Sequence, residues 1–391
     1  MNQQQAAASR GPQSRGVLVI FALVLAASLA SLASLAFSAG EAEGAGRVPQ
    51  GFAQARIASG LDAPTTMAMA PDGRIFVAQQ AGQLKVIKDG RLLGAAAINL
   101  AGRIDARGER GLLGIAFDPA FRSNRWIYLY YTQEATGTTA AHNRVVRFAV
   151  SGDRLLAGSQ KLILRLDDLG TATNHNGGAI RFGKDGKLYV AVGENATADN
   201  SQNFNNRLGK MLRINKDGTI PVDNPFTGRT QGDNRAIWAM GLRNPYTFAV
   251  QPGSGRIFIN DVGAQTWEEI NVGIGGTNYG WPRYEGSESD PMFNPPLYAY
   301  GHGTGKNLGC AITGGAFYNP GSVTFPRTFI GDYFFADFCG GYIRRYDSRE
   351  RSVITFATGI DRPVDLMVGG GGSLHYLERG TGSVYRVSHP G

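Results

Sequence analysis

A glycine-containing turn followed by a short run of aromatic and β-branched residues recurs along the chain. Runs of this kind are typical of β-strands that leave a tight turn. Most copies are followed by a second run of the same character, such as QLKVIKDG after the first copy and GSVYRV after the last. Each unit is therefore predicted to be a strand–turn–strand pair. The six copies are PDGRIFVAQQ (71–80), SNRWIYLYYT (123–132), KDGKLYVAVG (184–193), GSGRIFINDV (253–262), IGDYFFADF (330–338) and GGSLHYLERG (371–380).

The number of these units predicts the architecture. Their spacing is irregular, and few stretches between them have the periodicity of a helix. Radial repetition of similar β-units is typical of a propeller. We therefore expect residues 46–391 to form one all-β domain, a six-bladed β-propeller of four-stranded antiparallel sheets. The segment 52–60 is expected to add an outer strand to the last blade and close the ring, and two packed β-sandwiches are the alternative.

The first 45 residues have the pattern of a targeting segment. Arg10 and Arg15 precede an uncharged run at 16–37, and small residues follow at 38–40. A basic start, an apolar centre and a small-residue end are typical of a secretory signal peptide. The run is also long enough to span a bilayer, so an uncleaved membrane anchor is the alternative. In either case the pattern indicates an exported protein, either periplasmic or secreted.

Composition excludes several classes of protein. Glycine fills 55 of the 391 positions and charged residues make up only 18%, against usual shares of about 7% and about 25%. Because 42% of the residues are hydrophobic, wholesale disorder is excluded. The net charge is +8, but it forms no basic stripe: Arg344 and Arg345 are followed closely by Asp347 and Glu350. We therefore expect no nucleic-acid partner.

The chain contains two cysteines, Cys310 and Cys339. In an exported protein an even number of cysteines favours a disulfide. Cys310 opens one strand-like run and Cys339 closes the next, so consecutive antiparallel strands would bring them together. We expect a bond between them, and two separate free thiols are the alternative.

One candidate catalytic pair brackets a predicted hairpin. His175 lies in the sequence NHNGG before the hairpin, and Glu194 follows it. Both side chains can therefore emerge at the same end of the sheet. A carboxylate beside a histidine fixes the tautomer of the ring and raises its basicity, which suits a general base. A histidine before two glycines can equally be an ordinary turn residue.

Two other loops carry candidate ligands. Arg243 and Asn244, followed by a proline, could present rigid donors to carboxylates or carbonyls, or form a surface turn. Acidic residues and loop carbonyls gather between Trp267 and Glu285, and such oxygens suit calcium. The sequence contains no CxxC, HExxH, GxSxG or Walker motif, which excludes the usual zinc, acyl-transfer and nucleotide sites.

The order of several phrases resembles the soluble quinoprotein sugar dehydrogenases, the glucose/sorbosone dehydrogenase family. The similarity extends over roughly residues 52–388. The family's fold is a six-bladed propeller, in agreement with the repeats. The phrases are ERGLLGIAFDPAF (109–121), NHNGGAIRFGKDGKLYVAVGE (174–194), LGKMLRINKDGTIPVDNPF (208–226), WAMGLRNPYTFAV (238–250), EEINVGIGGTNYGWP (268–282) and AITGGAFY (311–318).

The resemblance implies an enzyme that binds pyrroloquinoline quinone (PQQ) and calcium at the mouth of the propeller and oxidises the anomeric hydroxyl of aldose sugars. It implies that His175 is the base that takes the hydroxyl proton and that Glu194 orients it. No CxxCH haem motif is present, so electrons would leave to a separate acceptor. The resemblance also assigns cofactor contacts to Glu109, Arg243, Asn244 and Arg362, the cofactor's calcium to the carbonyls of Gly263 and Ala264, and a second, structural calcium to Glu269, Tyr279 and Glu285.

The chain departs from the family pattern at three positions. Cys339 stands where the glucose-oxidising members have a lysine, Val364 replaces the second arginine of a pair, and Glu109 replaces a glutamine. The lysine and the second arginine supply positive charge to a tricarboxylate cofactor. The alternative function is therefore a non-catalytic extracellular propeller that binds carbohydrate or protein. A calcium-dependent lactonase-type hydrolase is a third hypothesis.

Overall fold

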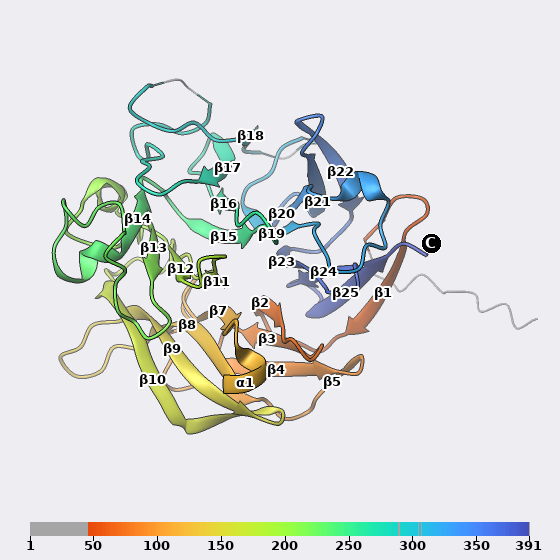
Figure 1. The fold of residues 1–391 in the computed structure, drawn as a ribbon, viewed down its shortest axis with the longest axis horizontal. Coiled ribbons are helices and arrows are strands. Elements are labelled where there is room, and N and C mark those ends of the chain that lie inside the picture. The colour runs from red at the N-terminus through yellow and green to blue at the C-terminus, as the bar shows by residue number, and fades with distance from the viewer. Residues whose placement is uncertain (1–45, 288–289, 304, 306, 391) are drawn as a thin grey trace, which may run out of the picture. The chain divides into compact units, whose positions relative to one another are not determined.

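The computed structural model describes residues 46–287, 290–303, 305 and 307–390. These residues form six antiparallel sheets arranged around a centre as a six-bladed β-propeller, as the repeats predict (Figure 1). The innermost strand of each blade contacts the innermost strands of both neighbours, so the ring is closed. The predicted signal peptide or anchor, at residues 1–45, lies outside the described residues.

The first three blades follow one another along the chain. From the centre outwards they are β2 (Pro64–Met69), β3 (Ile75–Gln79), β4 (Gln83–Lys88) with the short β5 (Arg91–Leu92) and β6 (Ile98–Asn99); β7 (Leu112–Phe117), β8 (Trp126–Gln133), β9 (His142–Ser151) and β10 (Arg154–Asp168); and β11 (Ile180–Phe182), β12 (Leu188–Val192), β13 (Lys210–Ile214) and β14 (Ile237–Met240). In blade 1 both short strands pair with β4, so its outer strand is split in two.

The last three blades complete the ring. They are β15 (Pro245–Val250), β16 (Ile257–Asp261), β17 (Trp267–Gly273) and β18 (Tyr298–Gly301); β19 (Ile312–Phe317), β20 (Tyr333–Asp337), β21 (Tyr342–Asp347) and β22 (Ser352–Thr358); and β23 (Pro363–Val368), β24 (Leu374–Glu378), β25 (Ser383–Ser388) and β1 (Ala53–Ala58). Helical structure in the described residues is limited to α1 (Phe121–Asn124), η1 (Ala198–Gln202), η2 (Gly232–Ala236) and η3 (Arg327–Phe329).

The six repeated phrases are the second strands of the six blades. In five of them, β3, β12, β16, β20 and β24, every residue is buried. Each sheet packs its two faces against two neighbouring blades, so a central strand has no solvent side. The alternation expected of a half-exposed strand is therefore replaced by a run of buried residues that are mostly apolar. This burial explains why the phrases stand out in the sequence.

The N-terminal strand closes the ring as predicted. β1 pairs with β25, with Ala53 opposite Ser388 and Ala58 opposite Val384. Blade 6 is thus built from both ends of the propeller sequence. Phe52, just before β1, packs edge-on against Phe325 and Phe356. Within the part of the chain that the structure describes, no helix has the length and hydrophobicity needed to span a bilayer.

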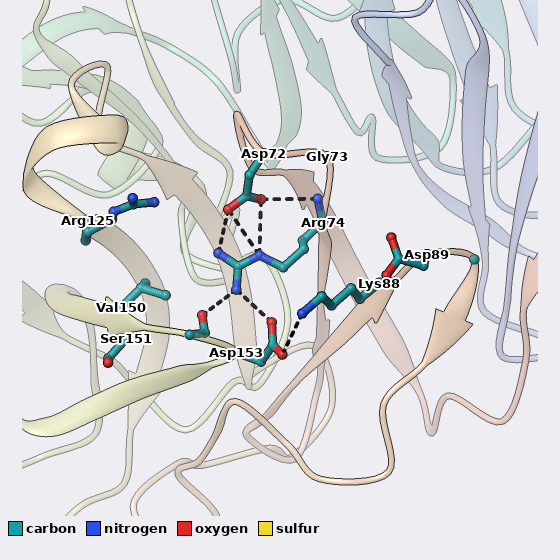
Figure 2. A pocket seen from close by; sticks show the side chains of 11 residues that line it. Asp72, Gly73, Arg74, Lys88, Asp89, Arg125, Val150, Ser151 and Asp153 are labelled. Carbon is teal, nitrogen blue, oxygen red and sulfur yellow. Dashed lines mark hydrogen bonds and ion pairs between the residues drawn. The ribbon is translucent and has the colours of Figure 1, made fainter.

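The blades have two distinct ends. Inner strands begin, and second strands end, at the same end of each sheet, which we call the mouth. At the opposite end, turns of adjacent blades are joined by ion pairs. Arg74, in the β2–β3 turn, bonds to Asp72 and to Asp153 in the β9–β10 turn at 2.9 Å, and Lys88 lies 3.4 Å from the same Asp153 (Figure 2). These residues line a hollow of about 780 Å³, and their contacts link blade 1 to blade 2.

A disulfide joins Cys310 and Cys339, as the sequence predicts. Cys310 lies just before β19 and Cys339 just after β20, so the bond ties the two mouth-end loops of blade 5. The Cα atoms are 5.6 Å apart. The carboxylate of Asp337 accepts hydrogen bonds from the backbone amides of both cysteines, at 3.1 Å and 3.0 Å. The two loops are thus held by a covalent bond and by one buried acid.

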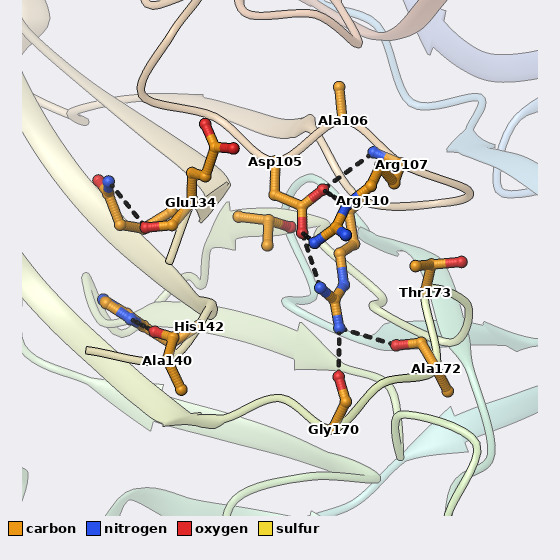
Figure 3. A network of polar contacts seen from close by, with 12 residues as sticks. Asp105, Ala106, Arg107, Arg110, Glu134, Ala140, His142, Gly170, Ala172 and Thr173 are labelled. Carbon is orange, nitrogen blue, oxygen red and sulfur yellow. Dashed lines mark hydrogen bonds and ion pairs between the residues drawn. The ribbon is translucent and has the colours of Figure 1, made fainter. Parts of the chain in front are cut away.

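The loop that leads into β11 is held by a buried ion pair (Figure 3). Arg110 bonds to Asp105 at 2.7 Å, and both side chains are almost fully buried. The same guanidinium donates to the carbonyls of Gly170 and Ala172, at 2.7 Å and 2.8 Å. The pKa of Asp105 is held well below its usual range by hydrogen bonds from Arg107 and from Arg110. Arg110 therefore fixes the backbone that precedes residue 175.

The disulfide should stabilise the fold. The bond joins positions 310 and 339 and so restricts the unfolded chain. We therefore expect Cys310→Ser combined with Cys339→Ser to lower the free energy of unfolding by about 3 kcal/mol. Urea unfolding of the wild type with and without dithiothreitol measures the same quantity without a mutation. The prediction is wrong if the reduced wild type and the oxidised wild type unfold at the same urea concentration.

The two arginines that bond to Asp105 should differ in how much they stabilise the fold. Arg110→Gln leaves the buried carboxylate of Asp105 with one partner fewer. We expect this change to lower the free energy of unfolding by about 3 kcal/mol. Arg107→Gln is the matched control: the Arg107 side chain is 71% exposed, so its removal should lower the free energy of unfolding much less than the removal of Arg110. Urea unfolding checks both, and equal losses would contradict the buried-pair interpretation.

Candidate functional site

His175 is held at the mouth by contacts from two blades. Its backbone amide donates to Glu109 Oε2 at 2.8 Å, and its carbonyl accepts from the amide of Asn195 at 3.0 Å. Its backbone is in the left-handed region, with φ of 57°. Non-glycine residues in that region are uncommon and cluster at functional sites. The loop therefore presents one particular side chain at a fixed angle.

His175 and Glu194 form the pair that the sequence predicts. The distance from His175 Nδ1 to Glu194 Oε1 is 2.5 Å, and the two side chains are 10% and 2% exposed. A carboxylate accepts a hydrogen bond, so Nδ1 carries the proton and Nε2 is left with its lone pair. Among the described residues, none hydrogen-bonds to Nε2. The geometry leaves this nitrogen available to take a proton from a ligand.

Arg243 and Asn244 lie in the loop before β15, and Asp261 fixes their backbone. The Asp261 carboxylate accepts from both amides, at 2.9 Å and 2.7 Å. The Asn244 side chain accepts from the amide of Gly177 at 3.0 Å and lies 3.5 Å from Glu109 Oε2. Asn244 thus connects blade 4 to the loop that carries His175. The Arg243 guanidinium instead donates to the carbonyls of Val262 and Gly263, at 3.1 Å and 2.6 Å.

A cavity of about 300 Å³ opens among the starts of the inner strands and the ends of the second strands. This volume lies at the lower end of the range for ligand pockets. Of the residues predicted to contact the cofactor, Glu109 and Asn244 line it. Residues that sequence reasoning missed also line it: Thr65, Gln80, Tyr246, Thr313, Phe338 and Arg379. Each occupies a mouth-end position in its repeat, so an alignment of the six repeats is the signal that could have found them.

The structure does not bring Arg362 to the cavity wall. Its side chain is 51% exposed and bonds through Nε to Asp361 at 3.0 Å. Val364, two residues on, does line the cavity, and its side chain is buried. The strand therefore directs residue 364 inwards and leaves residue 362 at the rim. The assignment of Arg362 to the cofactor stays a prediction, and the position that reaches the cavity carries no charge.

The residues predicted to hold a structural calcium surround a second, much smaller cavity. It has a volume of about 10 Å³, which is close to the space that one water molecule needs. Glu269, Tyr279, Glu285 and Gly263 line it, together with Asp261. Burial raises the pKa of Asp261 to about 8 and that of Glu269 to about 7. Buried carboxylates of this kind are stabilised by a cation.

The carboxylate oxygens at this cavity already have hydrogen-bond donors. Glu269 accepts from the amide of Gly286 at 2.6 Å, and Glu285 accepts from the amide of Ala264. Of the described residues, the only three ligand atoms of His, Cys, Asp or Glu within 4.8 Å of one another belong to Cys310, Asp337 and Cys339. Those two sulfurs are bonded to each other, so they are not a metal site. A side chain at position 263 would not fit, because a Cβ there would lie 1.6 Å from the Trp267 carbonyl oxygen.

Comparison with known proteins identifies the relationship. The family described as Glucose / Sorbosone dehydrogenase matches residues 61–378. Aldose sugar dehydrogenase YliI of Escherichia coli is 32% identical over 229 residues, 57% of this chain and 59% of that protein. This chain thus matches less than two thirds of the length of that curated relative.

Solved structures resemble this chain over a longer stretch than the curated relative does. The apo crystal structure of the soluble aldose sugar dehydrogenase of Escherichia coli has a TM-score of 0.75 at 27% identity, covering 87% of this chain and 100% of that one. The PQQ-bound aldose sugar dehydrogenase of Streptomyces coelicolor has a TM-score of 0.69 at 25% identity, covering 88% and 99%. Since the family match spans most of the sequence, this chain belongs to the glucose/sorbosone dehydrogenase family.

Proposed function

We propose that the protein is a quinoprotein dehydrogenase that oxidises the anomeric hydroxyl of an aldose, with PQQ as its cofactor. The family, and relatives described as aldose sugar dehydrogenases, support an oxidoreductase that acts on sugars. The observation that carries the finer proposal is the buried His175–Glu194 pair with its free Nε2. The backbone amide of His175 donates to Glu109, and Glu109 lines the cavity.

His175 is the general base in this proposal. Glu194 keeps the proton on Nδ1, so Nε2 can accept the proton of the substrate's C1 hydroxyl. As positive charge develops on the ring, the carboxylate at 2.5 Å stabilises it. PQQ, when bound, supplies the acceptor for the hydride that leaves C1. The sugar loses one proton and one hydride, and the anomeric carbon becomes a carbonyl carbon.

The cavity fits a planar, polyanionic cofactor in its donors and in its walls. Asn244 and Arg379 are donors that can reach carboxylate or carbonyl oxygens, and Phe338 and Tyr246 supply flat apolar surface. Cys339 is held in the disulfide and Val364 is apolar, so neither replaces the cations of the glucose-oxidising members. The proposal therefore relies on the other donors.

We include two calcium ions in the proposal. The carbonyls of Gly263 and Ala264 would hold the ion that accompanies the cofactor. The small cavity lined by Glu269, Tyr279 and Glu285 would hold the structural ion, because hard cations prefer carboxylate and carbonyl oxygens. Calcium at this second site would replace the amide donors of the carboxylates.

The proposal places the protein outside the cytoplasm, because of the signal pattern at residues 1–45. A separate acceptor would reoxidise the cofactor, since the sequence contains no haem-attachment motif. Direct assays can identify the aldose and the acceptor and can test for a membrane anchor.

The assignment of His175 leads to the first prediction for this function. His175→Gln should lower turnover of aldoses by about 10²- to 10⁴-fold, the usual contribution of a general base, while PQQ affinity is retained. Turnover is measured with a dye acceptor after reconstitution with PQQ and calcium. His389→Gln is the control, since His389 packs against Phe52, outside the mouth. If the reconstituted wild type oxidises no aldose, the binding-module alternative replaces this proposal.

The structural calcium leads to the second prediction. Calcium at 100 times its Kd should raise the free energy of unfolding by about 2.7 kcal/mol, and EDTA should reverse this. Glu269→Gln should remove most of the calcium-dependent rise in Tm, because it removes a buried anionic ligand. Glu350→Gln, in the exposed turn after β21, is the matched control. An equal response of Glu269→Gln and wild type would show that calcium does not bind at this cavity.

A further inference from the structure

Arg379 stands at the mouth end of blade 6, in a position to which the sequence assigned no role. It is the first residue after β24 and lines the cavity of about 300 Å³. Glu109, Asn244 and Val364 line the same space. Arg379 is therefore a cation in the wall of the proposed cofactor site.

The framework around Arg379 holds its guanidinium in place without neutralising it. One terminal nitrogen donates to the carbonyls of Ala63 and Pro64, at 2.9 Å and 3.1 Å, and the other donates to Gln80 Oε1. All three partners are uncharged. Within the described residues, no acidic side chain forms an ion pair with Arg379. A half-buried cation without a counter-ion is costly unless a ligand supplies one.

The acidic residue in the same wall, Glu109, already accepts a hydrogen bond. Glu109 Oε2 accepts the amide of His175 at 2.8 Å and lies 3.5 Å from Asn244 Nδ2. Tyr246 also faces this space. Burial raises the pKa of Tyr246, the charge of Arg379 opposes that rise, and the charge of Glu109 adds to it. The cavity thus presents positive charge on one wall and an occupied carboxylate on another.

The other cationic candidates are poorly placed. Arg362 is half exposed and bonded to Asp361. The Arg243 guanidinium donates to two backbone carbonyls, and Arg243 is not among the residues that line the larger cavity. Positions 339 and 364 carry no charge. Of the arginines near the mouth, Arg379 is the one whose side chain borders the larger cavity.

We propose that Arg379 binds a carboxylate of the quinone cofactor and supplies the positive charge that positions 339 and 364 do not provide. This inference rests on the proposed function, since it takes PQQ as the ligand. The remaining donors of the guanidinium match the geometry of a carboxylate. Arg379 is thus a binding residue, and it acts on cofactor affinity rather than on proton transfer.

The test compares PQQ, which has three carboxylates, with its uncharged trimethyl ester. Each is titrated into calcium-loaded protein, and binding is followed by quenching of tryptophan fluorescence. The wild type should prefer the acid. Arg379→Gln should weaken PQQ binding by about 10- to 100-fold, the usual contribution of a hydrogen bond to a charged group, and leave ester binding nearly unchanged. Arg379→Lys keeps the charge and should retain part of the preference.

The ratio of the two affinities is measured within one protein, so a variant that is partly unfolded still reports it. Arg386→Gln, in the exposed part of β25 of the same blade, is the control and should match the wild type. The inference is overturned if Arg379→Gln keeps the full preference for the acid, or if Arg362→Gln loses it instead. In both cases wild-type binding of PQQ leaves the proposed function intact. If the wild type does not bind PQQ, both the inference and the proposed function fail.

Discussion

Buried carboxylates at the mouth ends of the second strands hold the loops on which the site depends. Where the second strand of a blade ends and its inner strand begins, the backbone amides have no ladder partners and need acceptors. Asp261, Asp337 and Glu378, each the last residue of its second strand, provide them. They accept from the amides of Arg243 and Asn244, of Cys310 and Ala311, and of Asp361.

Blade 3 departs from this arrangement, and the departure creates the buried His175–Glu194 pair. Its acid, Glu194, lies beyond the end of β12 and bonds to the imidazole of His175 instead of to a backbone amide. The amide of His175 instead donates to the carboxylate of Glu109, in the loop before β7. Arg110, the next residue, fixes the carbonyls of the same loop. A neighbouring blade thus supplies the acceptor for the backbone amide, and the Glu194 side chain bonds to the imidazole of His175.

The sequence predicts the blades well because their signal is local. A strand that is buried on both faces is largely apolar, and in five of the six copies a glycine lies in the turn before it, so the copies are visible without a structure. The His175–Glu194 pair is also predictable, because both residues flank one hairpin. The residues of the cavity wall cannot be predicted in this way, because Arg379 and Gln80 come together only when the ring closes. Position 362 is turned to the rim by the strand geometry, which spacing in the sequence does not reveal.

The disulfide leaves position 339, at the mouth end of blade 5, without a charge. A cysteine at position 339 closes the loops of blade 5 covalently, but a residue in a disulfide cannot also present an ammonium group to the cavity. The valine at position 364 removes a second cation from the inner wall of blade 6. An anionic ligand would then meet a cavity with Glu109 on one side, and binding would be unfavourable without a compensating charge. In our proposal Arg379 supplies that charge from the end of β24, where neutral carbonyls fix the guanidinium and leave its charge uncompensated. The proposal thus joins two features of neighbouring blades: the disulfide closes the loops of blade 5, and the cation comes from blade 6.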